Sequence, residues 1–358
     1  MSASFEVRSS EGSYRVEIRS HAFGDYLQAL GNSVIVADEF FTSTVEPYKT
    51  ASIFVEAAEG NKSLDALPAI IEKVRRLGAT RQTELVAIGG GIVQDLSAFT
   101  ASVYMRGLAW SYLPTTLLAM VDSCIGGKSS INVGPYKNLV GTFHSPRQVL
   151  IDPSLAQTLP DDQKASGLIE AAKICFCRGA ESFQRHMALA PDISIDTDSL
   201  ESIIVNSLAS KKWFIEIDEF DKNERLLLNF GHTFGHAIEG ASHFAISHGI
   251  AVGLGILCAL TFARDGGANY KGAPNVGMLE NHLENMVSCV PGLTDHLKVM
   301  LMDDVVERFA SDKKHGADHY TLILVDEEGA VVRRKITKSP DVTLSVRRAV
   351  HSVIERFA

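Results

Sequence analysis

The stretch ELVAIGGGIVQDLSAF, residues 84–99, combines an apolar strand pattern, three consecutive glycines and the start of a helical pattern. Glycines between a strand and a helix allow the backbone to approach a pyrophosphate, whose charge then lies at the helix N-terminus. The stretch does not match the GxGxxG fingerprint, because Gln94 stands where the last glycine would be. It therefore predicts a strand–turn–helix unit in which Gly90 and Gly91 either bind a phosphate group or form only a tight turn.

Segments on both sides of this stretch continue the alternation of strands and helices. Short apolar runs at residues 33–38, 51–56, 109–114 and 148–153 are typical of buried strands, and residues 64–79 have the pattern of an amphipathic helix. This order predicts a parallel sheet with crossover helices. We therefore expect residues 1–160 to form an α/β nucleotide-binding domain.

After Pro160 the pattern becomes mostly helical. Residues 319–337 have the pattern of a β-hairpin, and helical periodicity is found at residues 162–177, 199–217, 230–241, 247–265, 276–289 and 341–357. We expect residues 161–358 to form a second, mostly α-helical domain. A cleft between two such domains is where ligands usually bind.

Composition excludes several classes of protein. The 358 residues are enough for two cores, and the net charge of -9 argues against a nucleic-acid-binding surface. Five scattered cysteines without a CxxC pair are typical of a reduced compartment, and the N-terminus has no apolar signal core. The longest apolar run, residues 249–263, is shorter than the ~20 residues that span a bilayer. We expect a cytoplasmic protein without nucleic-acid or membrane partners.

Polar side chains gather in residues 104–146, among glycines and apolar residues. Lys128 and Lys137 follow no helical charge pattern, so the segment indicates an anion pocket more than a solvated face, although either lysine alone could be a surface charge. The segment also contains Arg106, Thr115, Thr116, Asp122 and Asn138. A similar mixture precedes residue 230 and recurs near residue 313, with Lys211, Asp218, Arg225, Asn229, Lys313 and Lys314.

The stretch NFGHTFGHAIE, residues 229–239, sets His232 and His236 four residues apart, on one face of a helix. HxxxH alone is also found as a surface or core pair, and the HExxH motif of zinc proteases is absent. Together with His248 and Glu170, His232 could form a carboxylate–imidazole–imidazole site. That is the three-ligand arrangement of a catalytic zinc with one open position.

Several motifs occur in the order found in one known family. They are GGGxxxD, YMRG, PTTLLAxVDSxxGGK, KNxxGxF, GLxExxK, LNxGHTxGHAIE, HGxAV and DKK, spread from about residue 59 to residue 316. In these motifs the chain resembles the dehydroquinate synthases and, more broadly, the sugar phosphate cyclases. The resemblance implies an NAD-binding α/β domain, a helical metal-binding domain and a homodimer.

The resemblance also implies roles for individual residues. Glu170, His232 and His248 would bind zinc or cobalt. NAD would lie against Glu59, Lys62, Gly90, Gly91, Asp95, Thr115, Thr116, Lys128, Lys137 and Thr158. The substrate phosphate would contact Lys128, Asn138, His236, one lysine of the DKK motif (for which we take Lys314) and Arg106 of the partner subunit. Lys173, Lys211, Arg225 and Asn229 would face the hydroxyls and carboxylate of the substrate, with Asp122 among the catalytic residues.

The activity implied by the resemblance is a phosphate-eliminating lyase of the shikimate pathway, which leads to the aromatic amino acids. It would convert 3-deoxy-arabino-heptulosonate 7-phosphate into 3-dehydroquinate and phosphate, and NAD would be reduced and reoxidised within each cycle. A metal would act as a Lewis acid at the hydroxyl that is oxidised. Retention of Lys211, Arg225 and Asn229 favours an acid substrate, because only arginine offers the fork geometry that a carboxylate fits.

Four departures from the family pattern leave an alternative open. Gln94 and Ala98 replace glycines, Tyr136 replaces the glycine before KN, and Ile250 replaces the glutamate of HGEAV. These changes are compatible with a cyclase of a secondary pathway that acts on sedoheptulose 7-phosphate or glucose 6-phosphate. An iron-type alcohol dehydrogenase and a non-catalytic homologue are further alternatives, but neither explains the complete set of phosphate-binding residues.

Overall fold

The computed structural model describes residues 2–134 and 136–358, and internal contacts divide the chain into two units. Unit 1 comprises Met1–Leu159 and Asp196–Phe220, and unit 2 comprises Pro160–Ile195 and Asp221–Ala358. The sequence predicted a single boundary after residue 160. The segment Asp196–Phe220 therefore differs from that prediction, because it belongs to the same unit as the N-terminal residues.

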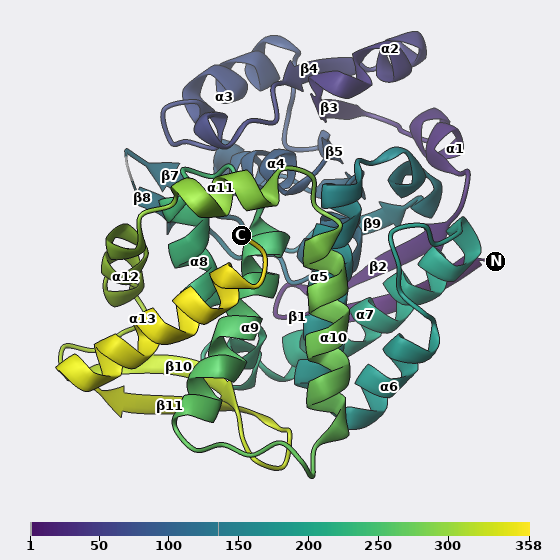
Figure 1. The fold of residues 1–358 in the computed structure, drawn as a ribbon. Coiled ribbons are helices and arrows are strands. Elements are labelled where there is room, and N and C mark those ends of the chain that lie inside the picture. Colours follow the sequence, from purple (N-terminus) through teal and green to yellow (C-terminus); the bar gives the residue numbers. More distant parts are fainter. Residues whose placement is uncertain (1, 135) are drawn as a thin grey trace. The chain divides into compact units, whose positions relative to one another are not determined.

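Unit 1 is built on a seven-stranded sheet with the strand order β1-β2-β9-β6-β5-β3-β4 (Figure 1). All neighbouring strands are parallel except β1 and β2, which form an antiparallel edge hairpin. The strands are β1 (Ser2–Ser9), β2 (Gly12–Arg19), β3 (Ser33–Asp38), β4 (Ala51–Val55), β5 (Glu84–Gly89), β6 (Trp110–Pro114) and β9 (Gln148–Ile151). The predicted α/β fold class and its five parallel strands are confirmed.

The N-terminal hairpin was not predicted. The sequence of the hairpin is mostly polar, but buried residues alternate along β2. Tyr14, Val16 and Ile18 are buried, and the residues between them are exposed or half-buried. Such alternation is the pattern of a strand with one solvated face. A count of period-two matches would have found this hairpin.

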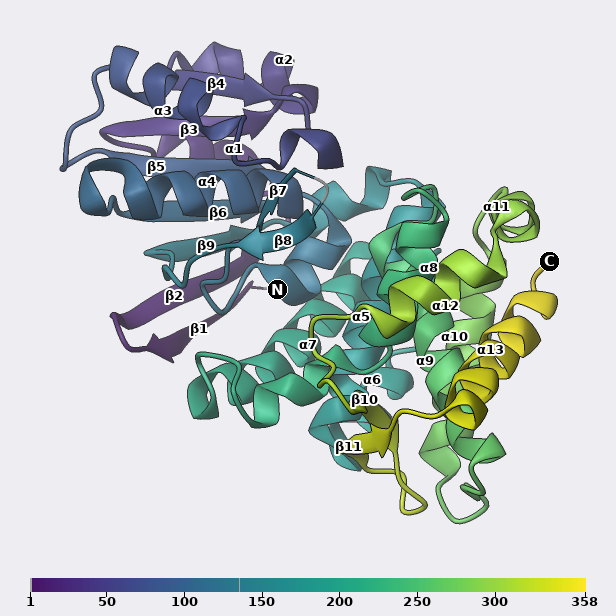
Figure 2. The ribbon, with the colours of Figure 1, turned by 90° about the vertical axis from the view of Figure 1, so that its left-hand side faces the viewer.

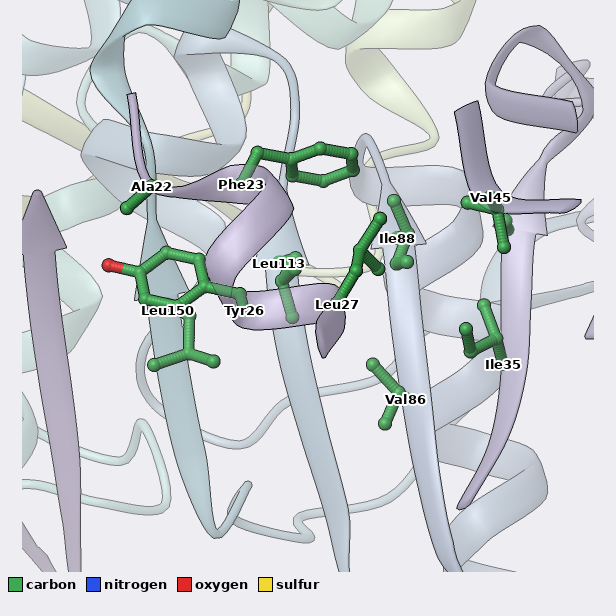
Figure 3. Close-up of a cluster of buried hydrophobic side chains, with 11 residues drawn as sticks. Ala22, Phe23, Tyr26, Leu27, Ile35, Val45, Val86, Ile88, Leu113 and Leu150 are labelled. Atoms are coloured by element: carbon green, nitrogen blue, oxygen red, sulfur yellow. The ribbon is translucent and has the colours of Figure 1, made fainter. Parts of the chain in front are cut away.

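One face of the sheet is covered by helix α1 (Phe23–Gln28), as Figure 3 shows. Phe23 and Leu27 of α1 lie in one buried cluster with Val86 and Ile88 of β5 and with residues of β3, β6 and β9. Since strand side chains alternate, Leu85 and Ala87 point to the opposite face. Helix α4 (Gly91–Val103) packs against β3, β5 and β6, and helix α3 (Leu67–Arg76) packs against α4 and β4 (Figure 2).

Helix α7 (Thr197–Ile217) explains why the segment Asp196–Phe220 belongs to unit 1. It packs against β1, against the π-helix η5 (Ala119–Ser123) and against the 3₁₀ helix η6 (Pro153–Thr158). Its buried residues recur every three or four positions, which forms one apolar stripe along the helix. The stripe consists of Leu200, Ile203, Ile204, Leu208, Phe214 and Ile215, and the buried polar residues Ser207 and Lys211 lie among them.

Unit 2 is mostly helical, as predicted. It contains α5 (Asp161–Arg178), α6 (Ala180–Ala188), η7 (Glu224–Asn229), α8 (His232–Ala241), α9 (His248–Asp265), α10 (Pro274–Ser288), α11 (Leu293–Val299), α12 (Met302–Ala310), α13 (Pro340–Glu355) and the hairpin of β10 (His319–Val325) and β11 (Val331–Thr337). Among the described residues, α9 is the one helix long and apolar enough to cross a membrane, and 72% of it is buried inside the structure. It packs against α5, α8, α10, α13 and β10, so it serves as the core helix of this unit.

Glycines allow α8 and α9 to approach each other closely. A Cβ atom added to Gly255 of α9 would lie 2.1 Å from the carbonyl oxygen of Gly231 and 2.5 Å from the amide nitrogen of Gly235. Real side chains do not tolerate such distances, so any larger residue at position 255 would separate the helices. The close approach matters because each of these helices begins with a histidine of the predicted metal site.

Two further histidines, His186 and His282, lie in the core of unit 2. His186 of α6 and His282 of α10 are 0% and 5% exposed, and their ring centroids are 6.1 Å apart in an edge-on arrangement. Neither ring nitrogen of His186 has a hydrogen-bond partner among the described residues. Burial, followed by the charge of His282, lowers the pKa of His186 to about 3. Burial also lowers the pKa of His282, to about 4.

Candidate active site

Three helices of unit 2 bring together the residues predicted to bind a metal. The ring nitrogens of His232, His236 and His248 lie within 4.8 Å of one another. Glu170, from the middle of α5, has its Oε1 atom 3.6 Å from Nε2 of His248 and 3.9 Å from Nε2 of His232. The structure thus places His236, which was predicted to contact phosphate, in the same group as the three predicted ligands.

The histidine rings are oriented by acceptors behind them. Nδ1 of His248 lies 3.3 Å from Oε2 of Glu239, and Nδ1 of His232 lies 3.3 Å from the carbonyl oxygen of Phe230. If both Nδ1 atoms donate, the Nε2 lone pairs remain available on the side of Glu170, which is the arrangement of ligating imidazoles with hydrogen-bonded second nitrogens.

Glu239 was not among the predicted site residues, although a signal for it exists in the sequence. Residues 232, 236 and 239 are separated by four and three positions, so all three lie on one face of α8. A carboxylate on the same helix face as two candidate ligand histidines is a candidate partner for a ring nitrogen.

The electrostatics of this group suit a cation. Both carboxylate oxygens of Glu170 are buried without a hydrogen bond from a described residue, although Nζ of Lys173 lies 2.5 Å from Oε2. Burial and then the charge of Lys173 hold the pKa of His232 well below its usual value. Burial and then the neighbouring His248 lower the pKa of His236 to about 3. Neutral imidazoles beside a buried carboxylate are the ligand forms that zinc and cobalt bind.

His248 differs from its two neighbours in charge state. Burial pulls the pKa of His248 down, but the hydrogen bond and the charge of Glu239 outweigh burial and raise this pKa above its usual value. A metal ion on Nε2 would compete with that proton, so metal binding at this histidine releases a proton.

Lys314 lies close to the histidines in the same unit. Its Nζ atom is 2.9 Å from Oδ2 of Asp312, and its charge contributes to the lowered pKa values of His232 and His236. Lys314 is half-buried, whereas Lys313 is exposed. Of the two lysines in the DKK motif, Lys314 is therefore the one whose charge reaches the cluster.

In unit 1 the structure brings together five of the predicted cofactor and phosphate residues. Nζ of Lys62 is 3.1 Å from Oδ2 of Asp95, 2.8 Å from Oδ1 of Asn138 and 3.9 Å from Oε1 of Glu59. Nζ of Lys137 is 3.2 Å from the same Glu59 oxygen. The network joins the 3₁₀ helix η3 (Glu59–Asn61), helix α4 and strand β8 (Tyr136–Val140).

Asn132 connects this network and was missed by the sequence analysis. Its Nδ2 atom donates to Oε1 of Glu59 at 2.9 Å, and its Oδ1 atom accepts the amide of Asn138 at 2.9 Å. Asn138 has a left-handed backbone with φ of 52°, which its short polar side chain tolerates. Asn132 lies on strand β7 (Ile131–Val133), and only the pairing of β7 with β8 reveals its role.

The glycine turn has the geometry expected for an anion site. Gly90 is the N-cap of α4, and no side chain of the described residues caps that helix end. A Cβ atom on Gly90 would lie 2.9 Å from Cγ2 of Thr116, whereas Gly91 faces open space. The amide of Thr115 donates to the carbonyl of Gly89, which aligns the ends of β5 and β6. The first amides of α4 are therefore available to a phosphate, so this site fits the pyrophosphate of a dinucleotide.

Asp95 stands beside this turn, and the pKa of its carboxyl group is raised. Burial raises the pKa of its carboxyl group to about 6, against the opposing effects of Lys62 and of the Ser130 amide. The ion pair with Lys62 therefore weakens below pH 6.

Asp122 and Lys211 form a separate pair in unit 1. Nζ of Lys211 lies 2.6 Å from both the carbonyl oxygen and the Oδ1 atom of Asp122. Lys211 lies on α7, which was predicted to belong to the helical domain. Because α7 belongs to unit 1, Lys211 contacts the π-helix η5 of that unit.

The remaining predicted residues lie elsewhere. Nζ of Lys128 is 5.8 Å from the ring centroid of Phe143. Arg106 is exposed with φ of 69°, and Thr158 is exposed and donates to the carbonyl of Leu155. Among the described residues, neither makes a hydrogen bond or ion pair with the Lys62 network. Arg225 and Asn229 lie on η7 in unit 2, directly before α8, and Arg225 is buried.

Fold and site together define a class of two-part protein. An α/β unit with an uncapped glycine turn is joined to a helical unit with a buried carboxylate–histidine cluster. The family described as 3-dehydroquinate synthase N-terminal matches residues 52–166, and the one described as 3-dehydroquinate synthase C-terminal matches residues 167–315. The chain belongs to the 3-dehydroquinate synthase family of sugar phosphate cyclases.

Known proteins with two different activities resemble the chain to a similar degree. The 3-dehydroquinate synthase of Dictyoglomus thermophilum is 36% identical over 296 residues, which cover 82% of this chain and 81% of that protein. The 2-deoxy-scyllo-inosose synthase of Streptomyces kanamyceticus is 33% identical over 309 residues, which cover 84% of this chain and 77% of that protein. A solved 2-deoxy-scyllo-inosose synthase, complexed with carbaglucose-6-phosphate, NAD+ and Co2+, has the same fold, with a TM-score of 0.84 at 21% identity and coverage of 98% of this chain and 99% of that one.

Proposed function

We propose that this cyclase converts 3-deoxy-arabino-heptulosonate 7-phosphate into 3-dehydroquinate and phosphate, with NAD and a zinc or cobalt ion as cofactors. The observation that carries the proposal is the burial of Arg225. Arg225 is only 3% exposed and lies on η7, the short helix that ends at Asn229, directly before the helix that begins with the predicted metal ligand His232. The planar guanidinium of an arginine fits a carboxylate with two parallel hydrogen bonds, which an acid substrate would supply.

The cofactors divide between the two units. Glu59, Lys62, Asp95 and the glycine turn would bind NAD, while Glu170, His232 and His248 would bind the metal. When bound, NAD supplies a hydride acceptor that is restored within each cycle, and the metal supplies a Lewis acid at the hydroxyl to be oxidised.

The side chains of the protein position the substrate. Lys128, Asn138, His236 and Lys314 would bind the phosphate, which these four residues can hold through charge and hydrogen bonds. Lys173, Lys211 and Asn229 would bind hydroxyl groups. Lys173 already lies against Glu170, so it can stabilise charge on an oxygen atom next to the metal site.

A second candidate is a cyclase of secondary metabolism that acts on glucose 6-phosphate or sedoheptulose 7-phosphate. It is favoured by the Streptomyces relative, whose identity of 33% is close to the 36% of the Dictyoglomus one. Gln94, Tyr136 and Ile250, which depart from the usual family pattern, also favour it.

A side-by-side assay of phosphate release decides between these candidates. Enzyme loaded with NAD and zinc or cobalt is given each of the three sugar phosphates at equal concentration. We expect kcat/KM to be highest for the heptulosonate. A higher kcat/KM for either sugar phosphate that lacks a carboxylate would reject the carboxylate role of Arg225 and support the second candidate. Absence of turnover with all three would reject both.

We further infer that the chain acts as a cytoplasmic homodimer. The five cysteines form no disulfide within the described residues, and Arg106 is exposed, as a residue that reaches a partner subunit must be in the isolated chain. Sedimentation equilibrium of the full chain tests the dimer, and a monomeric mass at micromolar concentration would exclude it.

A further inference from the structure

Three consecutive backbone carbonyls at the end of the π-helix η5 are each bound by a side chain. The hydroxyl of Ser207 donates to the carbonyl of Val121 at 2.8 Å, and Lys211 donates to the carbonyl of Asp122 at 2.6 Å. Nε2 of Gln94 donates to the carbonyl of Ser123 at 2.7 Å. The last carbonyls of a helix have no partner within the helix, so these side chains replace the missing turn.

Gln94 attaches to Ser123 by two hydrogen bonds, because Ser123 donates a second bond back to it. The hydroxyl of Ser123 donates to Oε1 of Gln94 at 2.6 Å, so the amide of Gln94 and Ser123 are joined by two short hydrogen bonds. Gln94 is 3% exposed, which protects both bonds from competition with water. We refer to the two bonds as the Gln94–Ser123 clamp.

The clamp connects two parts of the candidate site. Gln94 precedes Asp95, which binds Lys62, and Ser123 follows Asp122, which binds Lys211. Helix α4 and α7 therefore hold η5 from two sides, through Gln94 on one and through Ser207 and Lys211 on the other. A π-helix is rare and is often found at functional sites. The side chain of Asp122 reaches Lys211 only while this turn keeps its register.

The clamp depends on a residue at which the chain departs from its family. A glycine, which the usual family pattern has at position 94, could make neither bond. Both the nitrogen and the oxygen of the Gln94 amide bond to Ser123, so the function of this side chain is separate from phosphate binding by the backbone amides of the glycine turn.

We propose that Gln94 is a positioning residue that keeps Asp122 and Lys211 in register for the sugar phosphate, by fixing the end of η5 through Ser123. The proposal rests on the proposed function as far as the substrate is concerned. Lys211, which Asp122 holds, would bind hydroxyl groups of the substrate, whereas the cofactor would lie against the glycine turn. Loss of the clamp therefore impairs substrate binding and turnover and leaves cofactor affinity unchanged.

The test uses two variants in the same helix. Gln94→Met keeps the length and apolar volume of the side chain but removes both hydrogen bonds. Ala98→Gly is the control: it places a glycine inside α4, which lowers helix stability, and it leaves both hydrogen bonds to Ser123 in place. The first measurement is hydrogen exchange of the amides of residues 119–124 in the full chain without substrate. The second is kcat and KM for the sugar phosphate together with the dissociation constant of NAD.

We expect Gln94→Met to speed amide exchange in residues 119–124 by about tenfold or more, since the two hydrogen bonds that fix the end of η5 through Ser123 are lost. It should lower kcat/KM about 10- to 100-fold, the range expected for a small displacement of a positioned group, with the NAD constant changed less than about twofold. Ala98→Gly should lower the melting temperature and leave exchange in residues 119–124 as it is. Ser123→Ala loses only one of the two bonds, so its exchange rate and kcat/KM should lie between those of the unmodified chain and those of Gln94→Met. The double variant Gln94→Met, Ser123→Ala should have the same exchange rate and kcat/KM as Gln94→Met alone.

The proposal is overturned if Gln94→Met exchanges as slowly as the unmodified chain, or if Ala98→Gly changes exchange and kinetics to the same extent. It is also overturned if the NAD constant rises in step with the loss of turnover. If the unmodified chain turns over none of the sugar phosphates, the proposed function fails. The exchange comparison still decides whether the clamp exists.

Discussion

The buried pair His186 and His282 makes the stability of unit 2 sensitive to acid. Both pKa values are lowered in the folded chain, to about 3 and about 4, whereas the ordinary value is near 6.5. For a group with a lowered pKa, stability is complete above the unfolded pKa and is lost as the pH falls through the window down to the folded pKa. The unfolded chain then binds protons that the folded chain excludes.

The size of the effect follows from the two shifts. Between pH 7.5 and pH 5 each histidine should lower the free energy of unfolding by about 2 kcal/mol, because each pH unit between the unfolded and the folded pKa corresponds to about 1.4 kcal/mol. The pair together should cost about 4 kcal/mol, a large share of the ~5–15 kcal/mol that stabilises a typical protein. Leucine has a similar volume and no charge, so the double variant His186→Leu, His282→Leu should lose that much less on acidification.

Urea unfolding at pH 7.5 and pH 5 measures the difference. Far-ultraviolet circular dichroism reports mainly the helices of unit 2, whereas both tryptophans, Trp110 and Trp213, lie in unit 1 and report its unfolding separately. The exposed His351 provides the control variant His351→Leu, which should keep the acid sensitivity of the unmodified chain. Equal loss of stability on acidification in the double variant and the unmodified chain would refute the reasoning.

Three further predictions concern the site and the core of unit 2. Glu239→Leu should weaken metal binding about 10- to 100-fold in competition with a chelator, because the acceptor for Nδ1 of His248 is lost; unchanged affinity would show that Glu239 does not orient the ligand. Arg225→Lys should lower kcat/KM for the heptulosonate about 10- to 100-fold by losing the fork, and an equal loss with a neutral sugar phosphate would contradict carboxylate binding. Gly255→Ala should destabilise the chain by more than about 3 kcal/mol in urea, whereas Gly277→Ala, in open space on α10, should stabilise it by up to about 1 kcal/mol; equal midpoints would contradict the tight helix contact.

Local patterns predicted most of the elements of this fold. The buried strands β3, β5 and β6 have nearly continuous apolar sequences, and α9 is apolar all round, so both were recognisable without knowledge of their neighbours. The unit to which α7 belongs was not predictable in this way. Its apolar stripe shows that it packs against something, but not that the partner is the π-helix and β1.

The site residues also divide into those that local sequence patterns predicted and those that depend on tertiary contacts. The predicted metal residues are neighbours because each motif histidine begins a helix and glycines bring those helices together. Asn132 was missed because its bonds depend on how β7 pairs with β8. Gln94 was noticed only as a departure from a pattern, since nothing in the sequence relates it to Ser123.

The assignment of α7 to unit 1 has a consequence for synthesis of the chain on the ribosome. The α/β unit lacks a helix of its own until residue 220 has been made, because Pro160–Ile195 of the other unit comes first. At about 5–20 residues per second, translation of residues 160–220 takes about 3–12 seconds. During that interval β1 and the π-helix lack the apolar stripe of α7, and their exposed surface is a natural target for chaperones. A gene cut after codon 160 would produce that unfinished state permanently, so the two halves of this enzyme cannot be separated at the point where the sequence appears to divide.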